Sequence, residues 1–235
     1  MRRCVAMAFL FGLAPVLAQA HNYLDPNRAG ETHIPDIAVS RVVYRLLSAG
    51  EVHRYGFTAS AGQELFIQLL GPTEGPDALH APTFALIARG HPLSLGSARL
   101  EHGRWLDAAS FRKLVGAGDA DGLLVVAGEG AEFEPFFEPF TSTGYRIRQT
   151  LSLSAPAEGS YELVVFDPAH GSGRYVLATG RRERFGPGDL LRFPSVWLEV
   201  RRFMGESTAP LWVALGVIGA AAVGGTALLI LHRAR

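Results

Sequence analysis

The stretch EVHRYGFTASAGQELFIQLL, residues 51–70, decides the fold class of this chain. In its first half His53, Tyr55 and Phe57 occupy every second position, which is the period of a β-strand with one buried face. A second run of strand-forming residues follows the pair Ala61-Gly62, where the glycine permits a tight turn. The stretch therefore predicts a β-hairpin whose alternating aromatic side chains face a core.

The same period extends outward over residues 40–180, in short apolar runs bounded by Gly, Pro, Asp and Ser. No long amphipathic helix separates these runs, so the pattern favours an all-β domain, an antiparallel β-sandwich or jelly roll, over a parallel α/β sheet. The alternation breaks within residues 145–153, which suggests a β-bulge there. The expected strands are Val42–Leu47, Val52–Thr58, Glu64–Leu70, Thr83–Ala88, Leu123–Val126, Tyr145–Leu153, Tyr161–Phe166 and Arg174–Ala178.

Helices are expected only outside these strands. The pattern is least regular at residues 90–138, where Ala108–Val115 is expected to form a short helix and Gly116–Gly122 a loop. After the last strand, Gly186-Pro187-Gly188 is expected to turn, and Pro194 can begin a helix at its first position. This short helix is amphipathic, and it is expected either to lie against the outer leaflet of a membrane or to pack under the sandwich. An ordinary linker helix is the alternative. Four residues define its helical spacing: Trp197, Val200, Arg201 and Met204.

Both ends of the chain are hydrophobic, for different reasons. Residues 1–20 follow the plan of a secretory signal: Arg2 and Arg3 precede a short apolar run, which ends in the small-x-small cleavage site Ala18-Gln19-Ala20. Cleavage there leaves His21 as the first residue of the mature chain. Residues 210–231 are apolar and uncharged over a length that crosses a hydrocarbon core of ~30 Å.

These two segments predict the topology and the order of domains. Arg233 and Arg235 directly follow the apolar span, and basic residues at such a position stay on the cytoplasmic side. The expected protein is a bacterial single-pass type I protein of the inner membrane with a periplasmic ectodomain. Its expected parts are a signal peptide (1–20), an N-terminal extension (21–39), the sandwich (40–180), a juxtamembrane linker with the short helix (181–209), a transmembrane helix (210–231) and a cytoplasmic tail (232–235).

Composition excludes several kinds of chemistry. The single cysteine, Cys4, lies in the predicted signal, so the mature chain has no disulfide and no thiolate nucleophile or ligand. The formal net charge is zero and the arginines are scattered, which gives no basic stripe for nucleic acid. The sequence also lacks the short signatures of common hydrolases, zinc proteases and nucleotide-binding enzymes.

Two stretches resemble the bacterial pre-peptidase C-terminal domain, a small secreted jelly roll appended to exported proteases and other surface enzymes. The first, Glu51–Leu69, follows that family's turn, aromatic-bearing strand, Ala-Gly turn and second strand, although His53 stands where the family usually has an acidic residue. The second, AEGSYELVVFDPAHGSGRYVLA at Ala157–Ala178, matches its two Gly-x-Tyr strands. The resemblance implies a jelly roll and carries no catalytic residue.

A copper site is the sharpest chemical hypothesis for the mature N-terminus. The free α-amino group and the imidazole of His21 could chelate one copper ion, and a second histidine such as His33 could complete the site. A frayed terminus with an arbitrary first residue is the simpler alternative, since the chain has 8 histidines.

Three further segments invite a functional interpretation. Asp119-Ala120-Asp121-Gly122 has the alternating carboxylates of a calcium loop but lacks its other ligands. Residues 129–140 combine Glu129, Glu132, Glu134 and Glu138 with Phe133, Phe136, Phe137 and Phe140, and are expected to form a loop or edge whose phenylalanines plug the core while the glutamates stay solvated. In the span, Gly216, Ala220 and Gly224 form a smooth stripe on which a second helix could pack.

The function expected from these features is a membrane-anchored extracytoplasmic β-sandwich that binds or assembles with a partner and has no evident catalytic machinery. The partner could be another membrane protein or a second copy, held through the stripe in the span. A copper-binding or other metal-handling protein that uses His21 is one alternative. A hydrolase built from scattered Ser, His and Asp is the other, because such triads are defined by geometry and not by order in the sequence.

Overall fold

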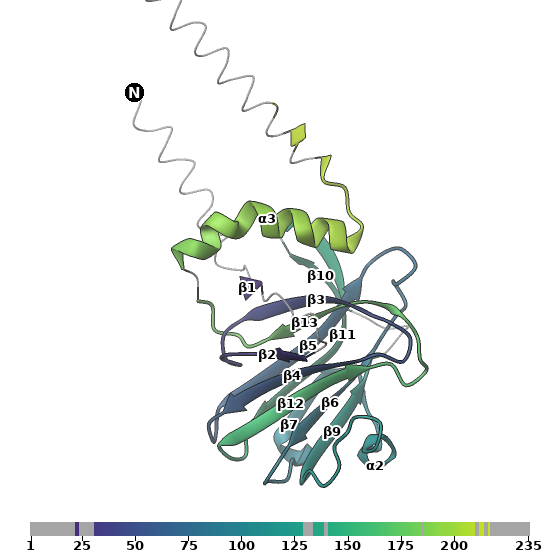
Figure 1. Ribbon diagram of the computed structural model, residues 1–235, viewed down its shortest axis with the longest axis vertical. Helices are drawn as coiled ribbons and strands as arrows, with labels where there is room; N and C mark the ends of the chain where they lie inside the picture. The colour runs from purple at the N-terminus through teal and green to yellow at the C-terminus, as the bar shows by residue number, and fades with distance from the viewer. Residues whose placement is uncertain are drawn as a thin grey trace, which may run out of the picture.

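The computed structural model describes residues 22–23, 31–128, 134–138, 141–184, 186–209, 212–213 and 216. Two β-sheets stack face to face, and few helices accompany them (Figure 1). The all-β, sandwich-like architecture expected from the period of two is therefore confirmed. All eight expected strands are present.

In the described part of the chain, the first sheet has seven strands in the order β1-β3-β13-β5-β11-β10, and β7 also pairs with β11. Pairing is antiparallel except for the short β1, which runs parallel to β3. The register of β11 against β5 shifts between Ile147 and Gln149, which places an irregularity where the sequence lost its alternation. The strands are β1 (Asn22–Tyr23), β3 (Arg41–Leu47), β5 (Glu64–Pro72), β7 (Ala98–His102), β10 (Glu134–Glu138), β11 (Thr143–Ser154) and β13 (Gly173–Thr179).

The second sheet has six strands among the described residues, in the order β2-β4-β12-β6-β9-β8. Its central strands pair in unbroken antiparallel register, and only the short edge strand β2 is parallel to its neighbour β4. The strands are β2 (Glu31–His33), β4 (Val52–Ala59), β6 (Thr83–Ala88), β8 (Arg104–Trp105), β9 (Gly122–Ala127) and β12 (Gly159–Phe166).

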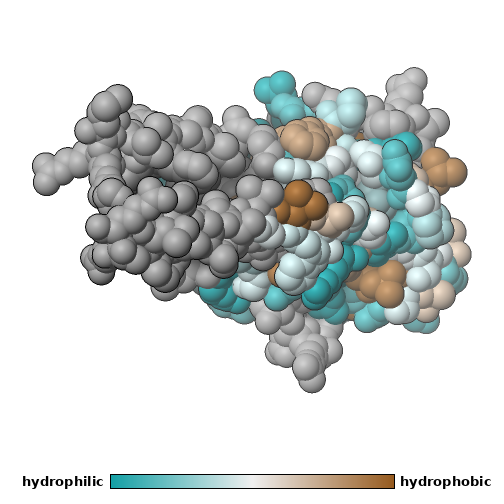
Figure 2. Space-filling view, turned by 90° about the horizontal axis from the view of Figure 1, so that it is seen from above, coloured by the Kyte–Doolittle hydropathy of each residue, from teal (hydrophilic) through white to brown (hydrophobic). Residues whose placement is uncertain are grey.

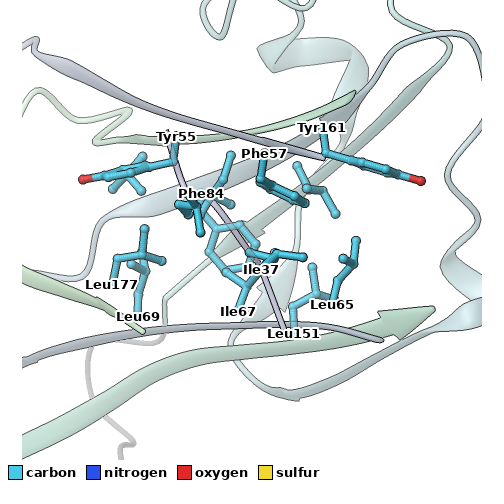
Figure 3. Packing of buried hydrophobic residues seen from close by; sticks show 14 of the residues in the cluster. Ile37, Tyr55, Phe57, Leu65, Ile67, Leu69, Phe84, Leu151, Tyr161 and Leu177 are labelled. Carbon is cyan, nitrogen blue, oxygen red and sulfur yellow. The ribbon is translucent and has the colours of Figure 1, made fainter. Parts of the chain in front are cut away.

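The main hydrophobic core lies between the two sheets. In β4 the alternation of the sequence becomes alternation in space, because His53, Tyr55 and Phe57 are buried while the residues between them face outward. Figure 3 shows Tyr55 and Phe57 facing Ile67 and Leu69 of the opposite sheet, with Ile37 among them. The core aromatics expected from sequence are all buried in this cluster: Tyr55, Phe57, Tyr161 and Tyr175.

Residues expected to precede the sandwich contribute to it. The sequence predicts an N-terminal extension at residues 21–39. Yet β1 and β2 extend one edge of each sheet, and Ile34 and Ile37 are completely or almost completely buried in the core. Short parallel edge strands carry too few residues to show a period, which is why the sequence did not reveal them.

Helix α3 (Pro187–Met204) packs on the outer face of the seven-stranded sheet (Figure 1). Val200 and Met204 are buried there against Val42 and Tyr44 of β3, so the helix packs on the sandwich through one apolar side. On the described part of the surface seen from above, hydrophobic residues stand singly among hydrophilic ones (Figure 2). This is consistent with an apolar side of α3 that is turned inward.

The start of α3 corrects the sequence-based expectation. The helix begins at Pro187 and not at Pro194. Pro187 and Gly188, expected to lie in a turn, are therefore its first two residues, and Pro194 lies inside the helix. Proline fits the first helical position, where its missing N–H would have no partner in any case. At Pro194 one backbone hydrogen bond is lost, and packing of the C-terminal half on the sheet holds the helix together.

Two arginines fix the C-terminal end of α3. Arg201 is buried, and its guanidinium donates to the carbonyls of Thr141 (3.1 Å) and Ser142 (2.7 Å) and contacts Glu206 (3.0 Å). Arg174 of β13 donates to the carbonyl of Phe203 at 2.5 Å. Cations beside the last carbonyls of a helix stabilise it.

The remaining helices are short. Helix α2 (Ala108–Phe111) and the 3-10 helix η1 (Leu95–Ser97) lie in the segment between β6 and β9. Asp107 caps α2, since its carboxylate accepts from the backbone N–H of Ala109 at 3.3 Å. The helix expected at residues 108–115 ends at Phe111. Val115, beyond its end, is buried against the outer face of the six-stranded sheet.

Among the described residues, no helix is long and apolar enough to cross a membrane. The expected span at 210–231 falls almost entirely outside the residues that the structure describes, as does the signal at 1–20.

Candidate functional site

A polar hollow of about 470 Å³ lies on the outer face of the six-stranded sheet. Its floor is a row of residues that cross four strands, because His33 of β2 pairs with Gly56 of β4, Gly56 with Glu162 of β12, and Glu162 with Ile87 of β6. Their neighbours complete the lining: Thr32, Arg54, Arg89, Ser160 and Tyr161.

Gly56 creates the hollow, and nothing in the local fold requires a glycine there. Its backbone is not in the left-handed region, β4 keeps regular register with β12 through it, and a Cβ placed on it would meet no atom within 4 Å. Glycine in a strand interior weakens the strand, and it often marks a place where something approaches closely. Here the missing side chain leaves open space in the middle of a sheet face.

One wall of the hollow is a fixed ion pair. Arg54 Nη1 lies 2.9 Å from Glu162 Oε1, and Arg54 Nη2 donates to the carbonyl of Val115 at 3.1 Å. The loop that carries Val115 closes over the guanidinium, since a Cβ on Gly116 would lie 2.9 Å from Arg54 Nη2. These contacts hold the Arg54 side chain in one position beside the floor.

The opposite wall carries a second guanidinium. Arg89 follows β6 directly, beside Ser160 of β12, and its side chain is exposed. No hydrogen bond or ion pair links Arg89 to another residue in the described part of the chain. With respect to the described residues, the hollow therefore presents one paired arginine, Arg54, and one without a partner, Arg89.

A Gly56→Val variant is expected to be more stable than the natural chain, by about 0.5–1 kcal/mol in the free energy of unfolding. A Cβ at this position meets no atom within 4 Å, and valine favours the extended backbone and reduces the freedom of the unfolded chain. Urea unfolding followed by far-UV circular dichroism measures the change. Loss of stability would show that Gly56 is a structural requirement of β4.

A second polar cluster is buried between the sheets. His53 Nδ1 lies 2.7 Å from the hydroxyl of Tyr175, which lies 2.5 Å from the hydroxyl of Tyr55. On its other side, His53 Nε2 lies 2.9 Å from Glu51 Oε1, although the two atoms are not aligned as a hydrogen bond. The chain of contacts joins β4 to β13 and so ties one sheet to the other.

Burial sets the ionisation of this cluster. Desolvation lowers the pKa of His53 below its usual value and raises the pKa of Tyr55 to about 12. Desolvation also opposes ionisation of Glu51, but the backbone N–H of Ser48, at 3.0 Å, and the imidazole of His53 outweigh it and lower the pKa of Glu51 to about 2. Neutral His53 beside ionised Glu51 is the state that folding favours.

Stability is therefore expected to fall with acid, beginning near pH 6.5. The contribution of His53 is complete above its unfolded pKa of about 6.5, and it is lost as the pH falls below that value, because the unfolded chain takes up the proton first. The contribution of Glu51 is lost at lower pH, from about 4.5 down to about 2. Urea unfolding at pH 8, 6 and 5 measures the slope, which for one proton reaches about 1.4 kcal/mol per pH unit.

The matched variants for this prediction are His53→Gln and His33→Gln. His53→Gln should flatten the slope between pH 6.5 and 5, whereas His33→Gln should leave it unchanged because His33 is exposed. An equal slope in both variants would contradict the assignment to His53.

A third feature is an apolar hollow of about 310 Å³ on the outer face of the seven-stranded sheet. Val42, Leu70 and Ile147 line it, and the hydroxyls of Tyr44 and Tyr145 lie 2.9 Å apart at its wall. The first two residues of α3 that pack on this face, Val196 and Val200, lie in the same apolar cluster. Much of this face is therefore the surface on which α3 packs.

The structure places some of the residues singled out from the sequence. His33 is exposed at the edge of the polar hollow, and Gly216 is exposed. His21, Ala220 and Gly224 lie outside the described residues, so the copper site and the packing stripe stay predictions. Within the described ranges, no three His, Cys, Asp or Glu side chains form a group that could hold a metal ion.

The two acidic segments have structural roles where they are described. Asp121 accepts a hydrogen bond from the backbone N–H of Gly90 at 2.8 Å and so holds the turn after β6. Residues 134–138 form edge strand β10, in which Phe136 is partly buried and Phe137 is 61% exposed. Glu138, expected to be solvated, is buried, and its carboxylate accepts from the backbone N–H of Thr141 at 2.8 Å. Glu129, Glu132, Phe133 and Phe140 lie outside the described residues.

Comparison with known proteins yields only weak similarities. No protein-family model matches the chain, and no curated protein matches it significantly. Among solved structures, the chain is similar to PliG of Aeromonas hydrophila, a periplasmic inhibitor of g-type lysozyme, with 16% identity, a TM-score of 0.33, and coverage of 67% of this chain and 98% of that one.

Two other solved structures have comparable similarity. The pre-peptidase C-terminal domain of a Bacillus anthracis collagenase has 12% identity and a TM-score of 0.25, with 68% of this chain and 93% of that one covered. CorA of Methylomicrobium album BG8, a surface-associated copper-binding protein, has 10% identity and a TM-score of 0.29, with 69% and 99% covered. The resemblance expected from sequence thus has a weak structural counterpart, and similarities at this level carry no argument about ligand, partner or location.

Proposed function

We propose that this protein is a non-enzymatic binding module that uses the outer face of its six-stranded sheet to hold a partner. The observation that carries the proposal is Gly56, a glycine that neither backbone conformation nor packing requires, at the centre of a hollow with charged walls. A glycine inside a strand destabilises the sheet. A ligand group that enters the open space would explain why this position has no side chain.

The arrangement of histidines favours binding over hydrolysis. Among the described residues, two histidine–carboxylate pairs occur, Glu51–His53 and His80–Asp167, the second at 3.2 Å. The nitrogen of His53 that faces away from Glu51, Nδ1, contacts the hydroxyl of Tyr175 in the core. Nδ1 of His80 is buried and has no hydrogen-bond partner among the described residues. Neither histidine thus has a serine beside it as a nucleophile of the kind that a hydrolase requires.

We further propose that the module stands on the outer face of the cytoplasmic membrane. The support comes from the sequence: a signal at 1–20 and an apolar span at 210–231 followed by Arg233 and Arg235. Helix α3 ends at Met204, shortly before the expected span, and packs on the face of the sandwich opposite to the hollow. A tether on that side leaves the hollow accessible, and the stripe Gly216, Ala220 and Gly224 is a proposed contact for a second membrane helix.

A periplasmic reporter enzyme fused after Ser207 is expected to be active, since the signal commits the preceding residues to export. Alkaline phosphatase activity in cells measures this. A cytoplasmic reporter fused at the same residue is the control and should be inactive. The opposite pair of results would show that the sandwich stays in the cytoplasm.

The binding face can be tested by photo-crosslinking in cells. Thr58 is exposed on β4, two residues beyond Gly56 and on the same face, whereas Glu74 is exposed beyond β5 of the other sheet. A photo-reactive residue at position 58 should give a crosslinked species that Gly56→Val removes, and one at position 74 should not give it. A species that is insensitive to Gly56→Val, or common to both positions, would reject this face.

A further inference from the structure

We infer that the polar hollow binds an oxyanion, a carboxylate or a phosphate carried by the ligand, and that Arg89 is the residue that recognises it. This inference rests on the proposed function, because it names the chemistry of the group that enters the space above Gly56. It makes the hollow a site for one acidic group of a larger molecule.

The balance of charge in the hollow favours an anion. Arg54 and Arg89 contribute two positive charges and Glu162 one negative charge. Glu162 already pairs with Arg54, and both side chains are about three-quarters buried, with 28% and 25% exposed. The charge left over is therefore the guanidinium of Arg89.

The placement of the groups also suits an oxyanion. On the outer face, Arg54 and Arg89 lie on opposite sides of Glu162, which occupies the centre of the row. A guanidinium offers paired N–H donors that match two oxygens of a carboxylate or phosphate. The hydroxyl of Ser160 lies on the strand next to Arg89 and can donate to the same group.

The volume sets the size of the ligand part that enters. A space of about 470 Å³ falls in the range of small-molecule sites and accommodates a ring the size of a monosaccharide. Glucuronate, glucose 6-phosphate and glucose are therefore suitable probes, because they share one ring and differ in the anion. Comparing the first two distinguishes a carboxylate from a phosphate as the preferred group.

The experiment is a ligand-observed NMR titration of the full-length chain in a non-ionic detergent with each of the three probes. Glucuronate, glucose 6-phosphate or both should bind in a saturable way, at least about tenfold more tightly than glucose, and more weakly as ionic strength rises. Arg89→Gln should weaken anion binding about tenfold, which corresponds to the loss of one charge-assisted contact. Gly56→Val should weaken it as well, because the valine side chain would occupy part of the floor of the hollow while every charge stays in place.

The control is Arg99→Gln, which removes an exposed arginine from β7 of the other sheet and should not change binding. Equal affinity for glucose and the anions, or anion binding that survives both Arg89→Gln and Gly56→Val, would overturn the inference. No binding of any probe, together with a Thr58 crosslink that Gly56→Val removes, would overturn the oxyanion and leave the binding face standing. A position-58 crosslink that persists in Gly56→Val, or that also forms from position 74, would instead reject the proposed function itself.

Discussion

A Gly180→Ala variant is expected to lose about 3 kcal/mol or more in the free energy of unfolding. Gly180 has a φ of +69°, where an alanine costs about 1–2 kcal/mol. Its Cβ would also lie 2.5 Å from the carbonyl oxygen of Val39 and 2.6 Å from that of Ile37. Both obstacles are backbone atoms, so no side chain can move aside, and overpacking of this kind adds about 1–3 kcal/mol.

The matched control is Gly62→Ala. Gly62 also has a positive φ, of +78°, but a Cβ on it meets nothing within 4 Å. The Gly62→Ala variant should therefore lose only the free energy that the positive φ costs an alanine, about 1–2 kcal/mol. Urea unfolding of both variants measures the difference. Equal losses would show that the backbone of residues 37–39 gives way easily and that the close approach to Gly180 does not hold the edge of the sandwich.

The interior of the fold was predictable from the sequence because one physical signal dominates it. Strands such as β4 and β12 have one face in the core, so alternation over eight residues identified them, together with the buried Tyr55 and Tyr161. The edge strands gave no such signal. β1, β2 and β8 have only two or three residues each, and the pairing that defines them comes from tertiary contact.

The candidate site was less accessible to sequence reasoning. Arg54, Arg89 and Glu162 are outward-facing charges, and in the sequence they do not differ from any other solvated position of a strand. Their proximity depends on the strand order β4-β12-β6, which the sequence does not state. The one available signal was Gly56, a glycine inside an otherwise regular alternating run, which is a recognised mark of close approach.

The largest effect of a single side chain is expected in the core, at Tyr55. A Tyr55→Ala variant should lose about 3–5 kcal/mol in the free energy of unfolding, because the ring is completely buried between the sheets and its removal leaves a cavity. The Phe137→Ala variant is the matched aromatic control. Phe137 is 61% exposed on β10, so its truncation should change stability by less than about 0.5 kcal/mol.

A Tyr55→Phe variant separates packing from the polar chain between the sheets. It keeps the ring and removes only the hydroxyl, which lies 2.5 Å from that of Tyr175. Tyr175 keeps its contact with His53 Nδ1 at 2.7 Å, so the loss should be about 1 kcal/mol, well below that of Tyr55→Ala. Urea unfolding of the three variants in one buffer measures all of these changes. A Tyr55→Phe loss as large as that of Tyr55→Ala would mean that the hydroxyl chain, and not the packed ring, is what joins the two sheets at β4 and β13.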